Sequence, residues 1–144
     1  MNYSMAKVVN GVVTEYPISE DTYKANVGLV QVVLPERKIV DAYTYIPSNP
    51  TLVNGQWVIT WVKDENTPAD IIALRTKNAE INVRYNRDML MNEAEFRVSR
   101  YNRLSRLGKP QIDDIAKLDQ YMQDLADVPT QPGFPFVIQW PTKP

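Results

Sequence analysis

Alternating apolar and polar positions, with many β-branched residues, run through the first part of the chain and predict β-strands. Asn10–Gly11 and Asn54–Gly55 each separate two such runs. Asn-Gly readily adopts the positive φ angles of a type I′ turn, so each pair predicts a β-hairpin. Two further strands are expected at residues 29–34 and 38–46, with a turn at residues 35–37 between them.

The last expected strand, residues 56–62, is apolar on both faces. Because side chains alternate along a strand, Trp57, Ile59 and Trp61 share one face. This pattern favours a central strand, or a strand with one face covered by another element. We interpret the two tryptophans as core residues of a small sheet, and a platform for a ligand or partner is the alternative.

Residues 67–107 predict one long helix, since they contain no glycine and Pro68 is their only proline. Thr67 is the expected N-cap, with Pro68 in the first helical position. Gly108 marks the expected end of the helix. A continuous helix of this span would measure about 60 Å at 1.5 Å per residue. It must therefore break, project, or pack along a partner helix.

The heptad pattern of this helix is compatible with a partner helix only in its first half. The apolar seam consists of Ile72, Thr76, Ala79, Val83 and Leu90. Beyond Leu90 the seam turns polar at Glu93 and Arg97. A self-associating coiled coil is one interpretation, and an amphipathic helix packed on its own domain is the other. If the helix breaks, we expect the break near Asn86 or Glu93.

A second, shorter helix is predicted at residues 110–126 by apolar residues that recur every three or four positions. These positions are Ile112, Ile115, Leu118, Met122 and Leu125. After Val128 the chain carries five of its eleven prolines together with three aromatic residues. Proline disfavours a regular strand or helix, yet this tail is too apolar to be solvated on all sides. We expect it to lie against its own helices, a second copy or another protein.

Together these elements predict an α+β fold. A small antiparallel β domain is expected at residues 1–66, and a long α-helix at 67–107. A shorter helix and an extended tail rich in proline and aromatic residues are expected at 108–144.

Composition narrows the chemistry, because the 144 residues include no cysteine and no histidine. Thiolate nucleophiles, disulfides, histidine bases and Cys or His metal ligands are thereby excluded. We expect no enzyme activity, cofactor or metal; a carboxylate-based glycan hydrolase is the enzymatic alternative. A net charge of −1 argues against nucleic-acid binding, and no apolar run is long enough to cross a membrane.

Arginine recurs at every third position late in the long helix, at Arg97, Arg100, Arg103 and Arg106. These side chains sweep about half of the helix circumference. They could contact phosphate or nucleic acid, or clamp an acidic partner surface. A third interpretation, which we favour, is pairing with the acidic segment that follows Gly108, within a helical hairpin.

The carboxy-terminal third contains four motifs in order: residues 100–104 (RYNRL), 121–129 (YMQDLADVP), 131–135 (QPGFP) and 140–144 (WPTKP). This combination resembles the phage tail assembly chaperone family, mainly over residues 97–144. The matching residues are Tyr121, Gln123, Leu125, Asp127, Pro129, Trp140, Pro141 and Pro144. Met122 and Ala126 stand where the family usually has arginine, and Gly108 and its neighbours replace the family's Asp-Trp.

The resemblance implies a non-enzymatic assembly factor that binds a phage tail-fibre or other tail protein and assists its folding, oligomerisation or attachment. The expected partner-binding residues are Arg97, Arg100, Arg103, Arg106, Tyr121, Phe134, Phe136, Trp140 and Pro141. A structural component of the virion tail, baseplate or fibre-attachment region is the alternative. A homo-oligomer through the long helix is the alternative to a helix that packs only within its own chain. The expected location is the host cytoplasm during assembly, or else the virion tail.

Overall fold

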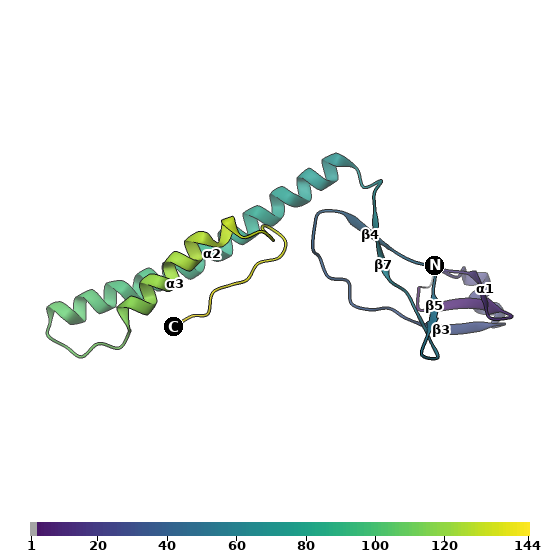
Figure 1. Ribbon diagram of the computed structural model, residues 1–144, viewed down its shortest axis with the longest axis horizontal. Helices are drawn as coiled ribbons and strands as arrows, with labels where there is room; N and C mark the ends of the chain where they lie inside the picture. Colours follow the sequence, from purple (N-terminus) through teal and green to yellow (C-terminus); the bar gives the residue numbers. More distant parts are fainter. Residues whose placement is uncertain (1–2) are drawn as a thin grey trace. The chain divides into compact units, whose positions relative to one another are not determined.

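The computed structural model describes residues 3–144 and has a mixed α+β architecture (Figure 1), which confirms the predicted fold class. A region rich in antiparallel strands precedes a long helix and a shorter helix. The chain divides into two compact units. The first unit extends to Lys38 and resumes at Tyr43–Thr67, and the second comprises Ile39–Ala42 and Pro68–Pro144.

The main element of the first unit is a five-stranded sheet with the strand order β2-β1-β3-β6-β5. Neighbouring strands are antiparallel except for β3 and β6, which are parallel. The strands are β1 (Met5–Val9), β2 (Val12–Glu15), β3 (Leu29–Val33), β5 (Thr51–Val53) and β6 (Gln56–Val58).

Both predicted Asn-Gly hairpins are confirmed. Asn10 and Gly11 have φ angles of 53° and 76° between β1 and β2. Asn54 and Gly55 have φ angles of 48° and 80° between β5 and β6. Positive φ at both central residues is what a type I′ turn requires, so the local sequence sets these two turns by itself.

The predicted strand at residues 38–46 is wrong, and so is its pairing with the strand before it. Only β4 (Thr44–Pro47) is extended there, and it pairs with β7 (Trp61–Asp64) in a separate two-stranded sheet. The reason is tertiary: residues Ile39–Ala42 leave the first unit and belong to the second.

The predicted strand at residues 56–62 divides at Ile59 into β6 and β7. The backbone N–H of Thr60 donates to Ser48 Oγ (2.9 Å), and the Ser48 N–H donates to the Thr60 carbonyl (2.8 Å). These bonds extend the pairing of β4 with β7 by one residue pair. As predicted for a central strand, β6 lies between β3 and β5.

The core of the first unit consists of Ala6, Val32 and Ile59. Trp57 and Trp61 pack against this cluster, so their interpretation as core residues is confirmed. The indole N–H of Trp61 also donates to the carbonyl oxygen of Pro35 (2.8 Å).

The short helix α1 (Glu20–Ala25) interrupts the strand-rich region and was not predicted from the sequence. Its N-cap, Ser19, accepts a hydrogen bond from the backbone N–H of Thr22. The Thr22 hydroxyl donates to Glu15 (2.6 Å), and the Ser19 N–H donates to the same carboxylate (2.7 Å). These hydrogen bonds lower the pKa of Glu15, with that from Thr22 the larger cause.

The long helix of the second unit, α2 (Ala69–Arg106), is continuous, so neither a break near Asn86 nor one near Glu93 occurs. The predicted N-cap is wrong by one position, since Pro68 is the cap. The Thr67 hydroxyl instead donates to the Asp64 carbonyl (2.7 Å) and accepts from the Thr44 N–H (2.9 Å).

The end of α2 follows the prediction, with Gly108 at a φ angle of 60°. The Gly108 N–H donates to the Ser105 carbonyl (3.1 Å), and the Lys109 N–H donates to the Leu104 carbonyl (2.9 Å). This is the Schellman arrangement, in which a left-handed residue after the helix satisfies its last carbonyl groups.

The second helix, α3 (Ile115–Asp127), starts five residues later than predicted, and the 3₁₀ turn η1 (Val128–Thr130) follows it. The start is set by Asp114, whose carboxylate accepts hydrogen bonds from the N–H groups of Ala116 and Lys117. Ile112 therefore lies outside the helix and is 72% exposed, against its expected place in the apolar stripe.

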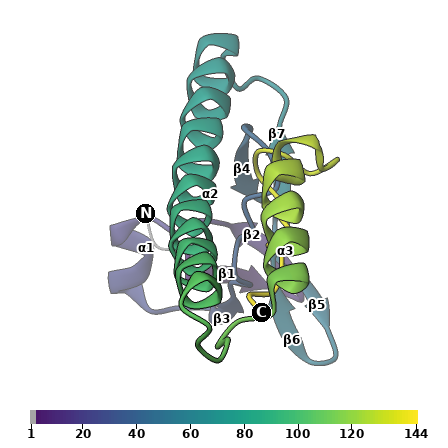
Figure 2. The same ribbon diagram turned by 90° about the vertical axis from the view of Figure 1, so that its left-hand side faces the viewer.

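Helix α3 runs back alongside α2 to form a helical hairpin (Figure 2). The hairpin core contains Ala94 of α2 and three residues of α3, namely Leu118, Tyr121 and Leu125. Leu90, from the seam predicted for a partner helix, packs against this core. Val83, from the same seam, is buried. That seam is therefore used within the chain.

Candidate partner-binding site

The carboxy-terminal tail folds back along α2 (Figure 1), and its Trp140 borders a hollow with Met89 and Leu90 of α2. The Lys143 ammonium group contacts both Glu93 carboxylate oxygens at 2.7 and 2.8 Å. The Arg97 guanidinium donates to the carbonyl oxygen of Pro144 (3.0 Å). These polar contacts hold the last residues of the chain beside the middle of α2.

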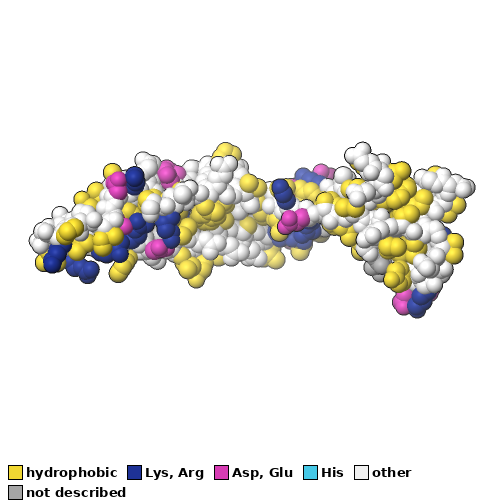
Figure 3. All heavy atoms as spheres, turned by 90° about the horizontal axis from the view of Figure 1, so that it is seen from below, with side chains coloured by type: hydrophobic (Ala, Val, Ile, Leu, Met, Phe, Trp, Pro, Cys, Tyr) yellow, Lys and Arg dark blue, Asp and Glu magenta, His cyan; other side chains and the backbone are white. Residues whose placement is uncertain are grey.

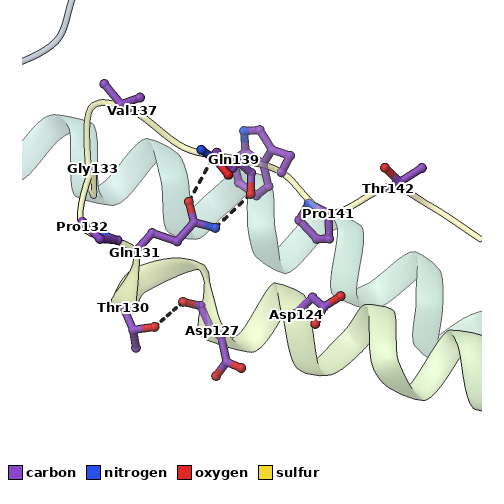
Figure 4. A pocket seen from close by; sticks show the side chains of 11 residues that line it. Asp124, Asp127, Thr130, Gln131, Pro132, Gly133, Val137, Gln139, Pro141 and Thr142 are labelled. Carbon is purple, nitrogen blue, oxygen red and sulfur yellow. Dashed lines mark hydrogen bonds between the residues drawn. The ribbon is translucent and has the colours of Figure 1, made fainter.

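The start of the tail is a closed loop, which Figure 4 shows from nearby. The Gln131 side-chain amide donates to the Gln139 carbonyl and accepts from the Gln139 N–H, both at 2.9 Å. Within the loop, the Val137 N–H donates to the Gly133 carbonyl (2.7 Å). A Cβ at Gly133 would lie 2.3 Å from the Val137 carbonyl oxygen, so only glycine fits there.

Two of the four predicted arginines are bound inside the hairpin. Arg97 Nε donates to one oxygen of Asp113 (2.9 Å), and Arg100 Nη2 donates to the other (2.6 Å). The Asp113 side chain is only 4% exposed, and both arginines are half-buried. The interpretation of these residues as a pair within a helical hairpin is confirmed, with one change. Their acceptor lies in the loop before α3, not in α3 itself.

The arginine pair sets the ionisation of Asp113. Hydrogen bonds from Arg100 and then Arg97 are the largest causes that hold the pKa of Asp113 below its ordinary value, against the opposing effect of desolvation. The Asp113 carboxylate thus joins the last turns of α2 to the loop that starts α3. Arg100 Nε is buried with no hydrogen-bond partner in the structure.

The other two predicted arginines, Arg103 and Arg106, are exposed near the end of α2. Leu107 and Ile112 are exposed in the same region. Figure 3 shows basic and hydrophobic side chains together at this end of the hairpin. The arginine series therefore divides into two residues that hold the hairpin and two that face solvent.

The predicted aromatic residues differ in accessibility. Tyr121 is buried in the hairpin core. Phe134 and Phe136 are half-buried, and the guanidinium carbon of Arg84 lies 5.6 Å from the centre of the Phe134 ring. Trp140 is 39% exposed, the most accessible of these aromatic side chains.

Trp140 and Pro141 both line a surface pocket of about 640 Å³ between the end of α3 and the tail (Figure 4). Carboxylates of Asp124 and Asp127 lie on one side of it, and Val137, 48% exposed, lies on the tail side. Trp140 also borders a smaller hollow with Met89 and nearby residues of α2. A pocket with apolar walls and a polar rim can accept a side chain of a partner protein.

Three contributors to this site were not expected from the sequence: Asp113, Glu93 and Gln131. Asp113 and Asp114 look alike in sequence, yet one accepts from arginines and the other caps α3. The excess of acidic residues after Gly108 was the feature of the sequence that indicated an acceptor for the arginines in this segment, but it did not single out Asp113. No local pattern identifies Gln131, which bonds Gln139 eight residues later, or Glu93, which bonds Lys143 of the tail 50 residues later.

Among residues 3–144, no helix is long and apolar enough to cross a membrane. In the same part of the chain, no group of three or more Asp or Glu residues is arranged to hold a metal ion.

The fold and the site define an α+β chain with a helical hairpin, and the carboxy-terminal tail of the chain packs along this hairpin. Residues 80–144 of this chain match the model of a family described as phage tail assembly chaperone protein. The predicted resemblance is thereby confirmed, and it extends upstream from residue 97 to residue 80. The chain matches no curated protein and no solved structure.

Proposed function

We propose that this chain is a non-enzymatic phage tail assembly factor that binds a tail-fibre or other tail protein and assists its folding, oligomerisation or attachment. The observation that carries the proposal is the overlap between the family match and the helical hairpin. The segment matched by the chaperone family, residues 80–144, is the part of the second unit that forms the hairpin core and the tail.

The proposed docking surface is the pocket at the start of the tail. Trp140, Pro141 and Val137 offer apolar contact area, and the nearby carboxylates and Gln131 supply polar contacts at the rim. Aromatic side chains in partly formed pockets commonly dominate the energetics of protein interfaces. A tail protein that inserts an apolar side chain between Val137 and Trp140 would use this arrangement.

The other predicted residues take supporting roles in this proposal. The side chains of Arg103 and Arg106 are exposed on the last turn of α2. Their positive charges orient an acidic region of the client by electrostatic attraction. Arg97 and Arg100 act indirectly, since they hold Asp113 and the end of the tail. Tyr121, Phe134 and Phe136 support the surface from within or beneath it.

The decisive experiment co-expresses the full chain with candidate tail and fibre proteins and measures which one co-purifies. Val137→Asp should reduce capture of the client at least about tenfold, because a charge would be buried at the contact. Val53→Asp is a matched control, since Val53 of β5 is exposed to nearly the same extent (49% against 48%). Equal capture by the two variants would contradict docking at the pocket.

A separate test is needed to show where the chain binds its client and whether it remains bound in the finished virion. We propose that the chain acts in the host cytoplasm during assembly and is absent from finished particles. Protein analysis of purified virions checks this directly. A fixed stoichiometry in the tail, baseplate or fibre-attachment region would favour the structural-component alternative over a transient chaperone.

A further inference from the structure

Helix α2 is apolar on a second face, away from the hairpin core. Its five exposed large apolar side chains, each between 54% and 68% accessible, are Leu74, Ile81, Tyr85, Met89 and Phe96. At about 100° per residue these positions fall within an arc of about 80°. The buried Val83 and Ala94 lie roughly half a turn away from this arc. We refer to these five residues as the outer stripe.

The spacing of the outer stripe is symmetric. With Asn78 and Asn92, which fall in the same arc, successive positions are separated by 4, 3, 4, 4, 3 and 4 residues. This order is the same when it is read in either direction from Tyr85. Leu74 and Phe96 are equidistant from Tyr85, as are Ile81 and Met89, and Asn78 and Asn92.

We propose that α2 pairs with α2 of a second copy of this chain, in antiparallel orientation about a two-fold axis at Tyr85. In this arrangement Leu74 faces Phe96 of the second copy, and Ile81 faces Met89 of the second copy. The two Tyr85 side chains meet at the axis. Each apolar position in one helix therefore meets an apolar position in the other, as packing between helices requires.

The asparagines fit the same arrangement, because Asn78 faces Asn92 of the second copy and each amide can both donate and accept. Polar residues at single core positions of paired helices set register and orientation at some cost in stability. The outer stripe spans 22 residue steps, or about 33 Å of helix. That length allows six contact layers besides the central one.

Charges beside the outer stripe complement the antiparallel partner. On one flank, Lys77 comes opposite Glu95 of the second copy, and Arg84 comes opposite Asp88 of the second copy. By the two-fold symmetry each pair occurs twice. Lys77, Glu95, Arg84 and Asp88 are exposed, although Asp88 also contacts Arg87 and Arg84 also lies over Phe134.

A parallel pair would lack this match. Lys77 and Glu95 are 18 positions apart, about 27 Å along the helix, so parallel helices in register would keep them separate. A parallel pair in register would also match the apolar positions, so the charges are what specify the antiparallel second copy as the occupant. This inference does not use the pocket residues Val137, Trp140 and Pro141, although Met89 borders a hollow with Trp140 and Arg103 lies on the same helical face beyond Phe96.

The first test measures the mass of the full chain by light scattering between about 5 and 500 μM, a range in which typical moderate protein associations are resolved. We expect a concentration-dependent dimer. Tyr85→Glu, which sets two carboxylates face to face at the axis, should weaken it at least about tenfold. Ile112→Glu is the control, since Ile112 is equally apolar and exposed but lies outside the stripe. A monomer at every concentration overturns the proposal, and so does equal weakening by both variants.

The second test determines orientation and uses the absence of cysteine from the chain. Asn78→Cys and Asn92→Cys proteins are prepared separately, mixed, and treated with a short bis-maleimide. We expect the mixed product to dominate. If each variant instead links mainly to itself, the helices are parallel and the proposal fails.

Charge reversal gives an independent measure of the same register. Lys77→Glu and Glu95→Lys should each weaken the dimer, and the double variant should recover most of the wild-type affinity. Circular dichroism checks that every variant keeps its helix content. An absence of recovery in folded double variant protein also contradicts the pairing. Client capture by Tyr85→Glu separates the two proposals, since this variant should remain able to bind the client.

Discussion

Asp113 shows how one side chain can join distant parts of this chain. Its two oxygens accept hydrogen bonds from Arg97 and Arg100, and Arg97 in turn reaches the carbonyl of Pro144. The last turns of α2 and the loop before α3 thus meet at the Asp113 carboxylate, and Arg97 links both to Pro144. A neutral residue at this position would leave two half-buried guanidinium groups without an anionic acceptor.

This arrangement predicts an acid-dependent stability. The folded pKa of Asp113 is below its ordinary value of 3.8, so the ion pairs stabilise the fold fully above that value. The stabilisation is lost as the pH falls through the lower, folded pKa. Thermal unfolding should therefore show Asp113→Asn melting below the wild type at pH 7. The difference should shrink toward zero between about pH 4 and pH 2. A difference that is constant with pH would contradict the assigned role.

Gly133 gives a second prediction at the residue scale. Its missing side chain lets the Val137 carbonyl approach, and Gly133→Ala would place a Cβ 2.3 Å from that oxygen. Overpacking usually costs about 1–3 kcal/mol, so amide hydrogen exchange at Val137 and Gln139 should accelerate about tenfold or more. Exchange within α3 should stay unchanged. Pro132→Ala, an exposed change in the same loop, is the control. Unaltered exchange at Gln139 would show that the loop tolerates a larger residue.

At the scale of elements, the pairing of α2 with α3 depends on few buried side chains. Leu118 and Leu125 of α3 are fully buried, and with Ala94 and Tyr121 they form the hairpin core. Helix α2 itself is apolar on two opposite faces, of which the hairpin covers one. This division explains why its pattern did not reveal from the sequence alone which face meets α3.

Leu118→Ala should destabilise the hairpin by about 2–5 kcal/mol, since it removes a fully buried leucine and leaves a cavity. Hydrogen exchange of the α3 amides measures this unit directly. Ile112→Ala, at a site that is 72% exposed, should change the same rates by less than about 0.5 kcal/mol in free energy. Similar effects of the two changes would mean that α3 is not held by the assigned core.

At the scale of the whole molecule, the chain has two separate cores. Ala6, Val32 and Ile59 belong to the first unit, whereas the hairpin cluster belongs to the second. Each core is made of residues from its own unit. The family match begins within α2, at residue 80, and covers none of the sheet residues. The unit proposed for client binding is therefore the one with the family's sequence features.

Ile59→Ala tests whether the two cores are energetically independent. Ile59 is fully buried, so its truncation should destabilise the first unit by about 2–5 kcal/mol. Exchange rates of the strand amides should rise, while those of the α3 amides should stay within about twofold of wild type. Matching losses of protection in both units would show that they unfold as one.

Several elements follow from local sequence because their determinants are adjacent residues. The two Asn-Gly turns and the Gly108 terminus each need a left-handed backbone, which asparagine and glycine supply at little cost. The long helix follows from the absence of glycine and internal proline. The same local patterns were sufficient to assign the α+β class and, through the ordered carboxy-terminal motifs, the resemblance to the family whose model matches residues 80–144.

Contacts between distant residues decided the pairing of the strands and the roles of the charged residues. The sequence by itself could not assign β4 to β7, because strand pairing depends on where Ile39–Ala42 and Ser48 lie in the fold. Nor could it distinguish Asp113 from Asp114, or the inner arginines from the outer ones, since like residues in one segment carry the same local signal. The packing of the helices and the tail determines which charge becomes buried and paired. It also determines which apolar face stays exposed. The free energy of burial depends on the surfaces that come into contact in the folded chain, and it cannot be derived from each residue alone.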